Sequence, residues 1–186
     1  MRASSKLLYS LLGGLVVCGA AQAVVGQQQK TDQELIENAT SAAPEAVAAK
    51  AAVIAVDAQG KVRTLREGSN NFTCLPDDPA NPENDPVCVD ENGLEWIKAL
   101  VGKKEPPPGK VGFGYMLQGG STASNLDPYA TEPPAGEWHQ EPPHVMIFNL
   151  GQLPQDYPQP GEQADMSQPW VMWAGTPYEH LMIPVE

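Results

Sequence analysis

The chain is short of positive charge. Its 186 residues include 11 Lys and Arg against 23 Asp and Glu, which gives a net charge of −12. Residues 111–186 contain no Lys or Arg at all. Nucleic acids and anionic lipid surfaces are bound through clustered positive charge, so neither is expected as a partner. Without Lys or Arg, this segment has to be stabilised by apolar packing and backbone pairing.

A long hydrophobic run is also missing. The apolar stretch from Leu7 to Val17 is shorter than the ~20 residues that a membrane-spanning helix needs. Arg2 and Lys6 precede it, and Ala21-Gln22-Ala23 follows it. This order is typical of a secretory signal peptide. We therefore expect residues 1–23 to be removed by cleavage after Ala23, which leaves a mature protein without a transmembrane span.

One alternative to cleavage after Ala23 is lipidation at Cys18. The sequence Leu15-Val16-Val17-Cys18 is similar to an acylation site, which would tether the protein to a membrane. Such sites have a small residue just before the cysteine, whereas Val17 is bulky and β-branched. The signal-peptide interpretation is therefore preferred, and a periplasmic or secreted location in a bacterium is expected.

Cysteine is scarce, with three residues in the whole chain. Cys18 leaves with the signal peptide, so that Cys74 and Cys88 remain as a pair in an oxidising compartment. A metal-binding or redox-active pair of thiols would be indicated by a C-x-x-C motif or a second cysteine cluster, and the sequence contains neither. A disulfide between Cys74 and Cys88 is therefore expected.

Proline is abundant, at 19 residues, and limits the helix content. We predict one α+β domain over residues 44–186, rich in loops. It follows a Gln-, Thr- and Ala-rich segment, residues 24–43, that is expected to be flexible although a short helix near Asp32–Thr40 is an alternative. The clearest helix spans residues 90–102, where apolar residues recur at helical spacing.

The sheet is predicted to be antiparallel or mixed and to lie mostly in the C-terminal half. Apolar runs bounded by turn residues predict its strands. These runs are residues 52–57, 61–67, 111–117, 145–150, 170–174 and 180–185. Between Cys74 and Asp90 the chain is acidic and punctuated by proline, which predicts a loop without paired strands.

The most specific local pattern is a repeated one, His144-Val145-Met146 and His180-Leu181-Met182. If both stretches are strands, each His and its Met point to the same face. Imidazole and thioether together suit copper, particularly Cu(I). The four residues His144, Met146, His180 and Met182 are thus candidate metal ligands, with Met116 and Met172 in neighbouring predicted strands as additional ones. The alternative without a metal is that these histidine and methionine side chains pack in the core.

Two other patterns are compatible with a metal. Glu137, His139 and Glu141 alternate in a segment that would present all three side chains on one face if extended. The acidic loop between the cysteines could offer carboxylates to calcium, but it lacks the spacing of an EF-hand. The alternative for both patterns is an exposed, solvated acidic surface that binds no metal. No cofactor is predicted, with copper as the alternative.

The catalytic motifs of nucleophilic enzymes are missing. There is no G-x-S-x-G elbow and no free cysteine in the predicted mature chain. The absence of a recognisable catalytic constellation favours a non-enzymatic binding or structural module. Such a module would bind a small molecule or a component of the envelope. A copper-handling or metal-dependent protein that uses the His and Met ligands is the alternative.

Several short motifs are distinctive when they are taken together: Leu65-Arg66-Glu67-Gly68, Phe72-Thr73-Cys74, Asp85-Pro86-Val87-Cys88, Tyr115-Met116-Leu117-Gln118-Gly119-Gly120-Ser121, Ala123-Ser124-Asn125, Pro143-His144-Val145-Met146 and Trp170-Val171-Met172-Trp173-Ala174-Gly175-Thr176-Pro177-Tyr178. Together they resemble a family of uncharacterised bacterial secreted proteins that carry a signal peptide. The resemblance spans about residues 45–185. It implies an exported bacterial protein of one domain and brings no activity, cofactor or catalytic residue.

Overall fold

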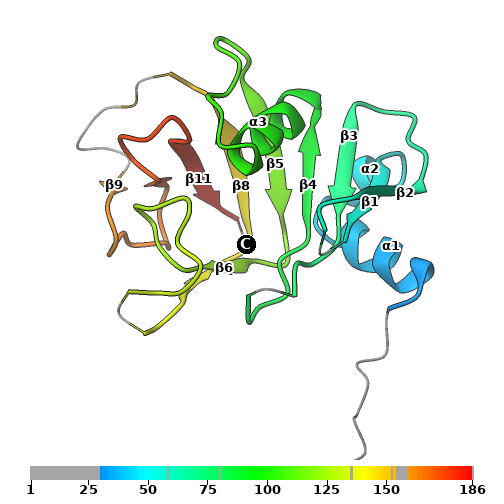
Figure 1. Cartoon of the computed structure of the whole chain (residues 1–186), viewed down its shortest axis with the longest axis horizontal. Coiled ribbons are helices and arrows are strands. Elements are labelled where there is room, and N and C mark those ends of the chain that lie inside the picture. Colours follow the sequence, from blue (N-terminus) through cyan, green and yellow to red (C-terminus); the bar gives the residue numbers. More distant parts are fainter. Residues whose placement is uncertain are drawn as a thin grey trace, which may run out of the picture.

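A computed structural model describes residues 30–57, 59–79, 81–134, 136–151, 153 and 159–185 (Figure 1). The predicted signal peptide with its cleavage site at Ala23 lies outside the described residues, and so does Cys18. Among the described helices, none reaches the length and apolarity that crossing a bilayer requires.

The described part contains three helices, α1 (Asp32–Thr40), α2 (Glu45–Ala48) and α3 (Glu91–Val101). Helix α3 confirms the helix predicted over residues 90–102. It begins at the N-cap residue Asp90, whose carboxylate accepts a hydrogen bond from the Gly93 amide at 2.8 Å. Trp96 and Ala99 lie on its buried face.

Helix α1 lies in the segment that the composition predicts to be flexible, and it is ordered for two physical reasons. Thr31 and Glu34 form a reciprocal capping box, which pairs two amides that a helix start otherwise leaves without partners. Ala39, at the end of the helix, is fully buried, as is Ala42 just beyond it. Ala39 and Ala42 pack in the same apolar cluster as Cys74 and Cys88 of the sheet.

Among the described residues, nine strands form one mixed sheet, in the order β2-β1-β3-β4-β5-β8-β11-β10-β9. Strands β6 and β7 form a separate pair. The bounds are β1 (Ala52–Val56), β2 (Val62–Arg66), β3 (Phe72–Leu75), β4 (Val87–Asp90), β5 (Gly112–Met116), β6 (Gly120–Thr122), β7 (His139–Glu141), β8 (His144–Phe148), β9 (Gln159–Pro160), β10 (Trp170–Met172) and β11 (His180–Pro184). Neighbouring strands are antiparallel, except that β1 pairs with β3 and β9 with β10 in parallel.

The α+β class is confirmed, but the sheet is not confined to the C-terminal half. Strands β3 and β4 lie at the two ends of the segment predicted as an unpaired loop, with Cys74 directly opposite Cys88. The predicted disulfide joins these two residues. The prolines that argued against strands lie between β3 and β4, and so do not interrupt the pairing.

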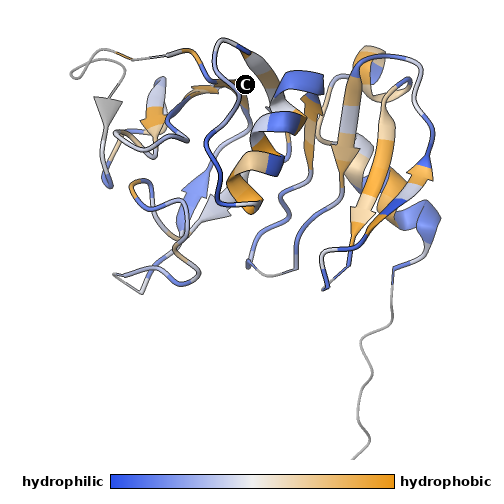
Figure 2. Ribbon diagram, turned by 45° about the horizontal axis from the view of Figure 1, so that its top comes forward, coloured by the Kyte–Doolittle hydropathy of each residue, from blue (hydrophilic) through white to orange (hydrophobic). Residues whose placement is uncertain are grey.

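The helices cover opposite faces of the sheet. Cys88 and Val89 are successive residues of β4, so their side chains point to opposite faces. Cys88 packs in one apolar cluster with Ala39 of α1 and Ala48 of α2. Val89 packs in the other with Trp96 of α3. Helix α3 lies over β5 and β8 in the view of Figure 1. Trp96 of the helix packs in one apolar cluster with Met146 and Phe148 of β8, and Figure 2 shows hydrophobic segments on the helix and on the neighbouring strands.

Candidate functional site

The four candidate copper ligands lie on two paired strands. In the antiparallel register of β8 and β11, Met146 is directly opposite Met182, and each histidine lies at a different end of the pairing. His144, Met146, His180 and Met182 are all buried, as expected for one face of the sheet. The order along the strands is therefore His144, the methionine pair, then His180.

His144 is fixed in one orientation and left with one free nitrogen. Its Nδ1 lies 2.7 Å from the Pro142 carbonyl, so Nδ1 carries the proton and donates it. The residue is 0% exposed, and Nε2 has no hydrogen-bond partner among the described residues. Burial lowers the pKa of His144 to about 4, and the ring is neutral at pH 7. Its Nε2 therefore holds a lone pair in the protein interior.

His180 sits among aromatic side chains instead. Its Nδ1 donates to the Tyr178 carbonyl at 2.9 Å. Its ring centroid lies 5.0 Å from that of Trp96 and 5.1 Å from that of Trp173, in edge-on arrangements. Burial lowers the pKa of His180 to about 4. These contacts give His180 a packing role in the core between α3 and the sheet.

A carboxyl group that the sequence did not single out as a partner of His144 lies close to the free nitrogen of this residue. Glu141 Oε2 lies 3.9 Å from His144 Nε2, and the Glu141 side chain is 5% exposed. Burial, and then the nearby charge of Asp85, raise the pKa of Glu141 to about 8. Burial also raises the pKa of Asp85, to about 6. Glu141 thus lies between the imidazole of His144 and the charge of Asp85, and it carries a proton at pH 7.

The second candidate pattern, Glu137, His139 and Glu141, is divided between two environments. His139 and Glu141 both lie on β7, but Glu141 is directed toward Asp85 and His144, whereas His139 contacts Glu162. Within the part of the chain that the structure describes, no three His, Cys, Asp or Glu side chains converge as a metal site requires.

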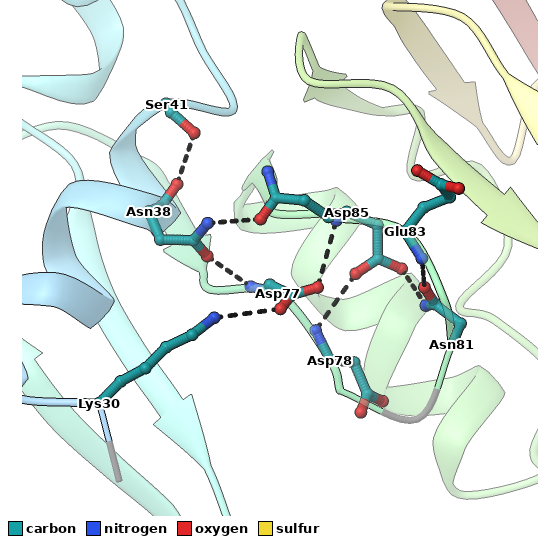
Figure 3. A network of polar contacts seen from close by, with 9 residues as sticks. Lys30, Asn38, Ser41, Asp77, Asp78, Asn81, Glu83 and Asp85 are labelled. Carbon is teal, nitrogen blue, oxygen red and sulfur yellow. Dashed lines mark hydrogen bonds and ion pairs between the residues drawn. The ribbon is translucent and has the colours of Figure 1, made fainter. Parts of the chain in front are cut away.

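The acidic loop uses its carboxylates to hold itself together (Figure 3). Asp85 Oδ1 accepts from the Asp78 amide at 3.2 Å, and Asp77 Oδ1 accepts from the Asp85 amide at 3.4 Å. The Asn81 side chain donates to Asp85 Oδ2. Lys30 forms an ion pair with Asp77 at 3.2 Å. The proposed calcium ligands Asp77 and Asp85 therefore act as acceptors within the loop.

A cavity of about 340 Å³ lies beside the β6–β7 pair. Trp138 and His139 line it at the start of β7, Ser124 from the loop after β6, and Glu162 from the segment after β9. The His139 Nε2 atom lies 3.0 Å from Glu162 Oε1, and the Ser124 hydroxyl donates to Glu162 Oε2 at 3.0 Å. Glu137 lines the cavity as well and is exposed.

A larger groove of about 890 Å³ lies at the other end of the sheet, beside the β1–β2 hairpin. Two ion pairs lie in its lining: Arg63 donates to Asp32 at 2.7 Å, and Lys30 contacts Asp77. The lining of this groove contains no aromatic residue, whereas the smaller cavity combines the indole of Trp138 with polar groups. The smaller cavity is therefore the better candidate for a binding site.

Sequence reasoning placed His139 and Trp138 on a solvated surface and did not connect them with Ser124 or Glu162. The run of small and polar residues from Gln118 to Asn125, which follows an apolar strand, is the one signal in the sequence that points to Ser124. Glu162 lies far from His139 in the sequence, and no local pattern around it indicates a residue of a binding site.

Comparison of the chain with protein-family models, with curated proteins and with solved structures finds no match.

Proposed function

We propose that the chain is an exported bacterial protein that acts in the cell envelope as a non-enzymatic binding module. The observation that carries the proposal is the cavity beside β7, in which an indole, an imidazole, a hydroxyl and carboxylates line one hollow. Pockets for small molecules combine apolar walls with a few placed polar groups, and this one has that composition.

The order of the hydrogen bonds favours binding over nucleophilic catalysis. A serine nucleophile needs its hydroxyl to donate to the base. Here the Ser124 hydroxyl donates to Glu162, and the same carboxylate also contacts His139. The carboxylate thus stands between the hydroxyl and the imidazole. The arrangement holds Ser124, Glu162 and His139 in place as a rigid wall.

The binding role is tested by nuclear magnetic resonance on the mature chain. Tetramethylammonium chloride, sodium acetate and glycerol are titrated separately, and the indole N–H of Trp138 is followed. We expect one of these three chemical classes to shift this resonance in a saturable way, and Trp138→Leu to abolish that response. If none of the three shifts it, the cavity is not a ligand site and the proposal fails.

The export part of the proposal is tested by intact mass. Expression with the native N-terminus in a bacterium is expected to release a chain that begins at Val24 and is two hydrogens lighter than its reduced form. The disulfide between Cys74 and Cys88 supports export, because such bonds persist in oxidising compartments. Retention of Met1, or free thiols at both cysteines, would contradict it.

The second candidate function is copper handling, and one observation favours it. The free Nε2 of His144 is buried, with its tautomer set by Nδ1, as in imidazoles that bind metals. Met116 is opposite His144 in the register with β5, and Met146 follows on the same face of β8. A soft ion such as Cu(I) would accept this nitrogen and the two thioethers.

Competition for Cu(I) against a chromogenic chelator tests the copper candidate. His144→Ala and Met116→Leu are expected to lose the bound copper, and His139→Ala is expected to keep it. Equal copper uptake by all three variants and the unaltered protein would show that this histidine is not a ligand.

A further inference from the structure

We infer that the cavity beside β7 binds a small organic cation, an ammonium compound in which the charge is carried by an alkylated nitrogen. The inference rests on the proposed binding function and adds the chemical class of the ligand. It is argued from the charge, the aromatic surface and the size of the cavity.

The cavity is lined by carboxylates, and no Lys or Arg side chain lines it. Glu162 and Glu137 both line the cavity. Residues 111–186, which include every residue lining the cavity, contain no Lys or Arg. The whole chain carries a net charge of −12, which attracts cations and repels anions at long range. A carboxylate or phosphate ligand would therefore meet repulsion here.

The hydrogen bonds of Glu162 hold its carboxylate in place. Oε1 contacts His139 Nε2 at 3.0 Å, and Oε2 accepts from Ser124 at 3.0 Å. Ser124 is itself fixed, because its hydroxyl oxygen accepts from the amides of Leu126 and Asp127 at 3.1 and 3.0 Å. A charge that is held in place before the ligand arrives costs less to order on binding.

The aromatic wall identifies the cation as organic. Trp138 lines the cavity next to Glu137 and His139. Indole is the aromatic ring that attracts an ammonium group most strongly, and alkyl groups on the nitrogen pack against it. A hard metal ion would instead need several oxygen ligands. Within the described ranges no three acidic or imidazole side chains converge to supply them.

The volume limits the ligand to a small molecule. At about 340 Å³, the cavity is near the lower end of the range for ligand pockets, about 300–1,000 Å³. A compound of the size of choline is suitable for it, whereas a folded partner or a long peptide is not.

Choline and its neutral isostere 3,3-dimethylbutan-1-ol give the sharpest test, because they share a shape and differ in charge. Calorimetry on the mature, oxidised protein is expected to show choline binding at least about tenfold tighter than the isostere, as a desolvated cation–π contact with a nearby carboxylate implies. Glu162→Gln keeps the size of the side chain and removes its charge, and is expected to weaken choline binding by about tenfold or more. Trp138→Leu is expected to do the same.

Glu132→Gln serves as the matched control. Glu132 is exposed on the loop before the cavity and does not line it, so choline binding should be unchanged in this variant. Thermal melts of all variants show whether a loss of choline binding comes from unfolding. Glu137→Gln tests the second carboxylate that lines the cavity. Glu137 is exposed, so this substitution leaves the fold intact.

The outcomes separate the two proposals. Equal affinity for choline and its isostere, or undiminished choline binding in both Glu162→Gln and Glu137→Gln, overturns the cation inference while the cavity remains a binding site. Binding of acetate or glycerol alone does the same. Absence of any binding by all the probes overturns the binding function itself.

Discussion

At the scale of single residues, the most unusual feature is a protonated carboxyl group inside the protein. Glu141 is buried next to the free nitrogen of His144 and near Asp85. A charged Glu141 would lack solvent and face a second carboxylate, so the protonated form is favoured. In that form its hydroxyl can donate to His144 Nε2 once the 3.9 Å gap closes, and the pair is then neutral.

This proton makes stability depend on pH in a defined direction. The folded protein holds the Glu141 proton more tightly than the unfolded chain, with a pKa of about 8 instead of 4.5. The free energy of unfolding therefore falls as the pH rises from 4.5 to about 8. His144 and His180 have the opposite effect, since a pKa lowered from 6.5 to about 4 removes stability as the pH falls below 6.5.

Urea unfolding between pH 7.5 and 8.5 isolates the contribution of Glu141, because both buried imidazoles are then neutral in the folded chain and mostly neutral in the unfolded chain. We expect the unaltered protein to lose stability there, with a slope of at most about 1.4 kcal/mol per pH unit. Glu141→Gln should remove that slope. Glu83→Gln, at an exposed position, should retain it. An equal slope in the Glu141→Gln variant would show that this carboxyl group does not hold the proton.

At the scale of elements, helix α3 docks on β5 through two glycines. A Cβ atom on Gly112 would lie 2.4 Å from the Gly93 amide nitrogen and 2.8 Å from its Cα atom. The same strand has Gly114, where a Cβ would lie 2.9 Å from Met146 Cε and 3.0 Å from Phe148. Asp90 ties the two elements together, since its Oδ1 accepts from Gly93 and, at 3.1 Å, from the Phe113 amide.

Gly112→Ala is therefore expected to force α3 away from the sheet. Backbone atoms cannot move aside as side chains can, so the cost should be about 3 kcal/mol or more of unfolding free energy. The neighbouring Val111→Ala, at a position 37% exposed, should change it by no more than about 0.5 kcal/mol. Chemical denaturation of both variants gives the comparison. A Gly112→Ala protein as stable as the original would mean that α3 does not approach β5 this closely.

At the scale of the whole molecule, the disulfide connects an apolar core cluster with the acidic loop between β3 and β4. Cys74 and Cys88 lie in the apolar cluster with α1 and α2. The loop between them carries the acidic network that reaches Glu141 through Asp85. The disulfide thus links β3 to β4, lies in the apolar cluster with α1 and α2, and closes the base of the acidic loop.

Replacement of both cysteines by alanine is expected to lower the free energy of unfolding by about 3 kcal/mol, the loss of loop closure across 14 positions. Urea unfolding of the double variant, compared with the oxidised protein, measures it. Adding a reductant to the oxidised protein should lower stability by a similar amount and leave the variant unchanged. A loss below about 1 kcal/mol would show that the strand pairing of β3 and β4 already restrains the unfolded chain.

Much of the fold could be predicted from local sequence. The apolar spacing of Leu94, Ile97 and Leu100 located α3, and the runs of apolar residues between turns located β1, β2, β5, β8, β10 and β11. The strands β3 and β4 were missed because the prolines near them signal a loop, and a two-residue element such as β9 leaves no pattern. Helix α1 was placed correctly as an alternative, but its burial depends on neighbours that composition does not reveal.

The candidate site was predictable only in part. The sequence by itself determined the pairing of the two remaining cysteines, the shared face of each His and Met, and the lack of cations in the last 76 residues, because these follow from residue type, position and strand periodicity. Tertiary structure alone brought Glu162 to His139, and Asp85 to Glu141. Those contacts join segments separated along the chain, and burial, which sets their charges, exists only once the chain has folded.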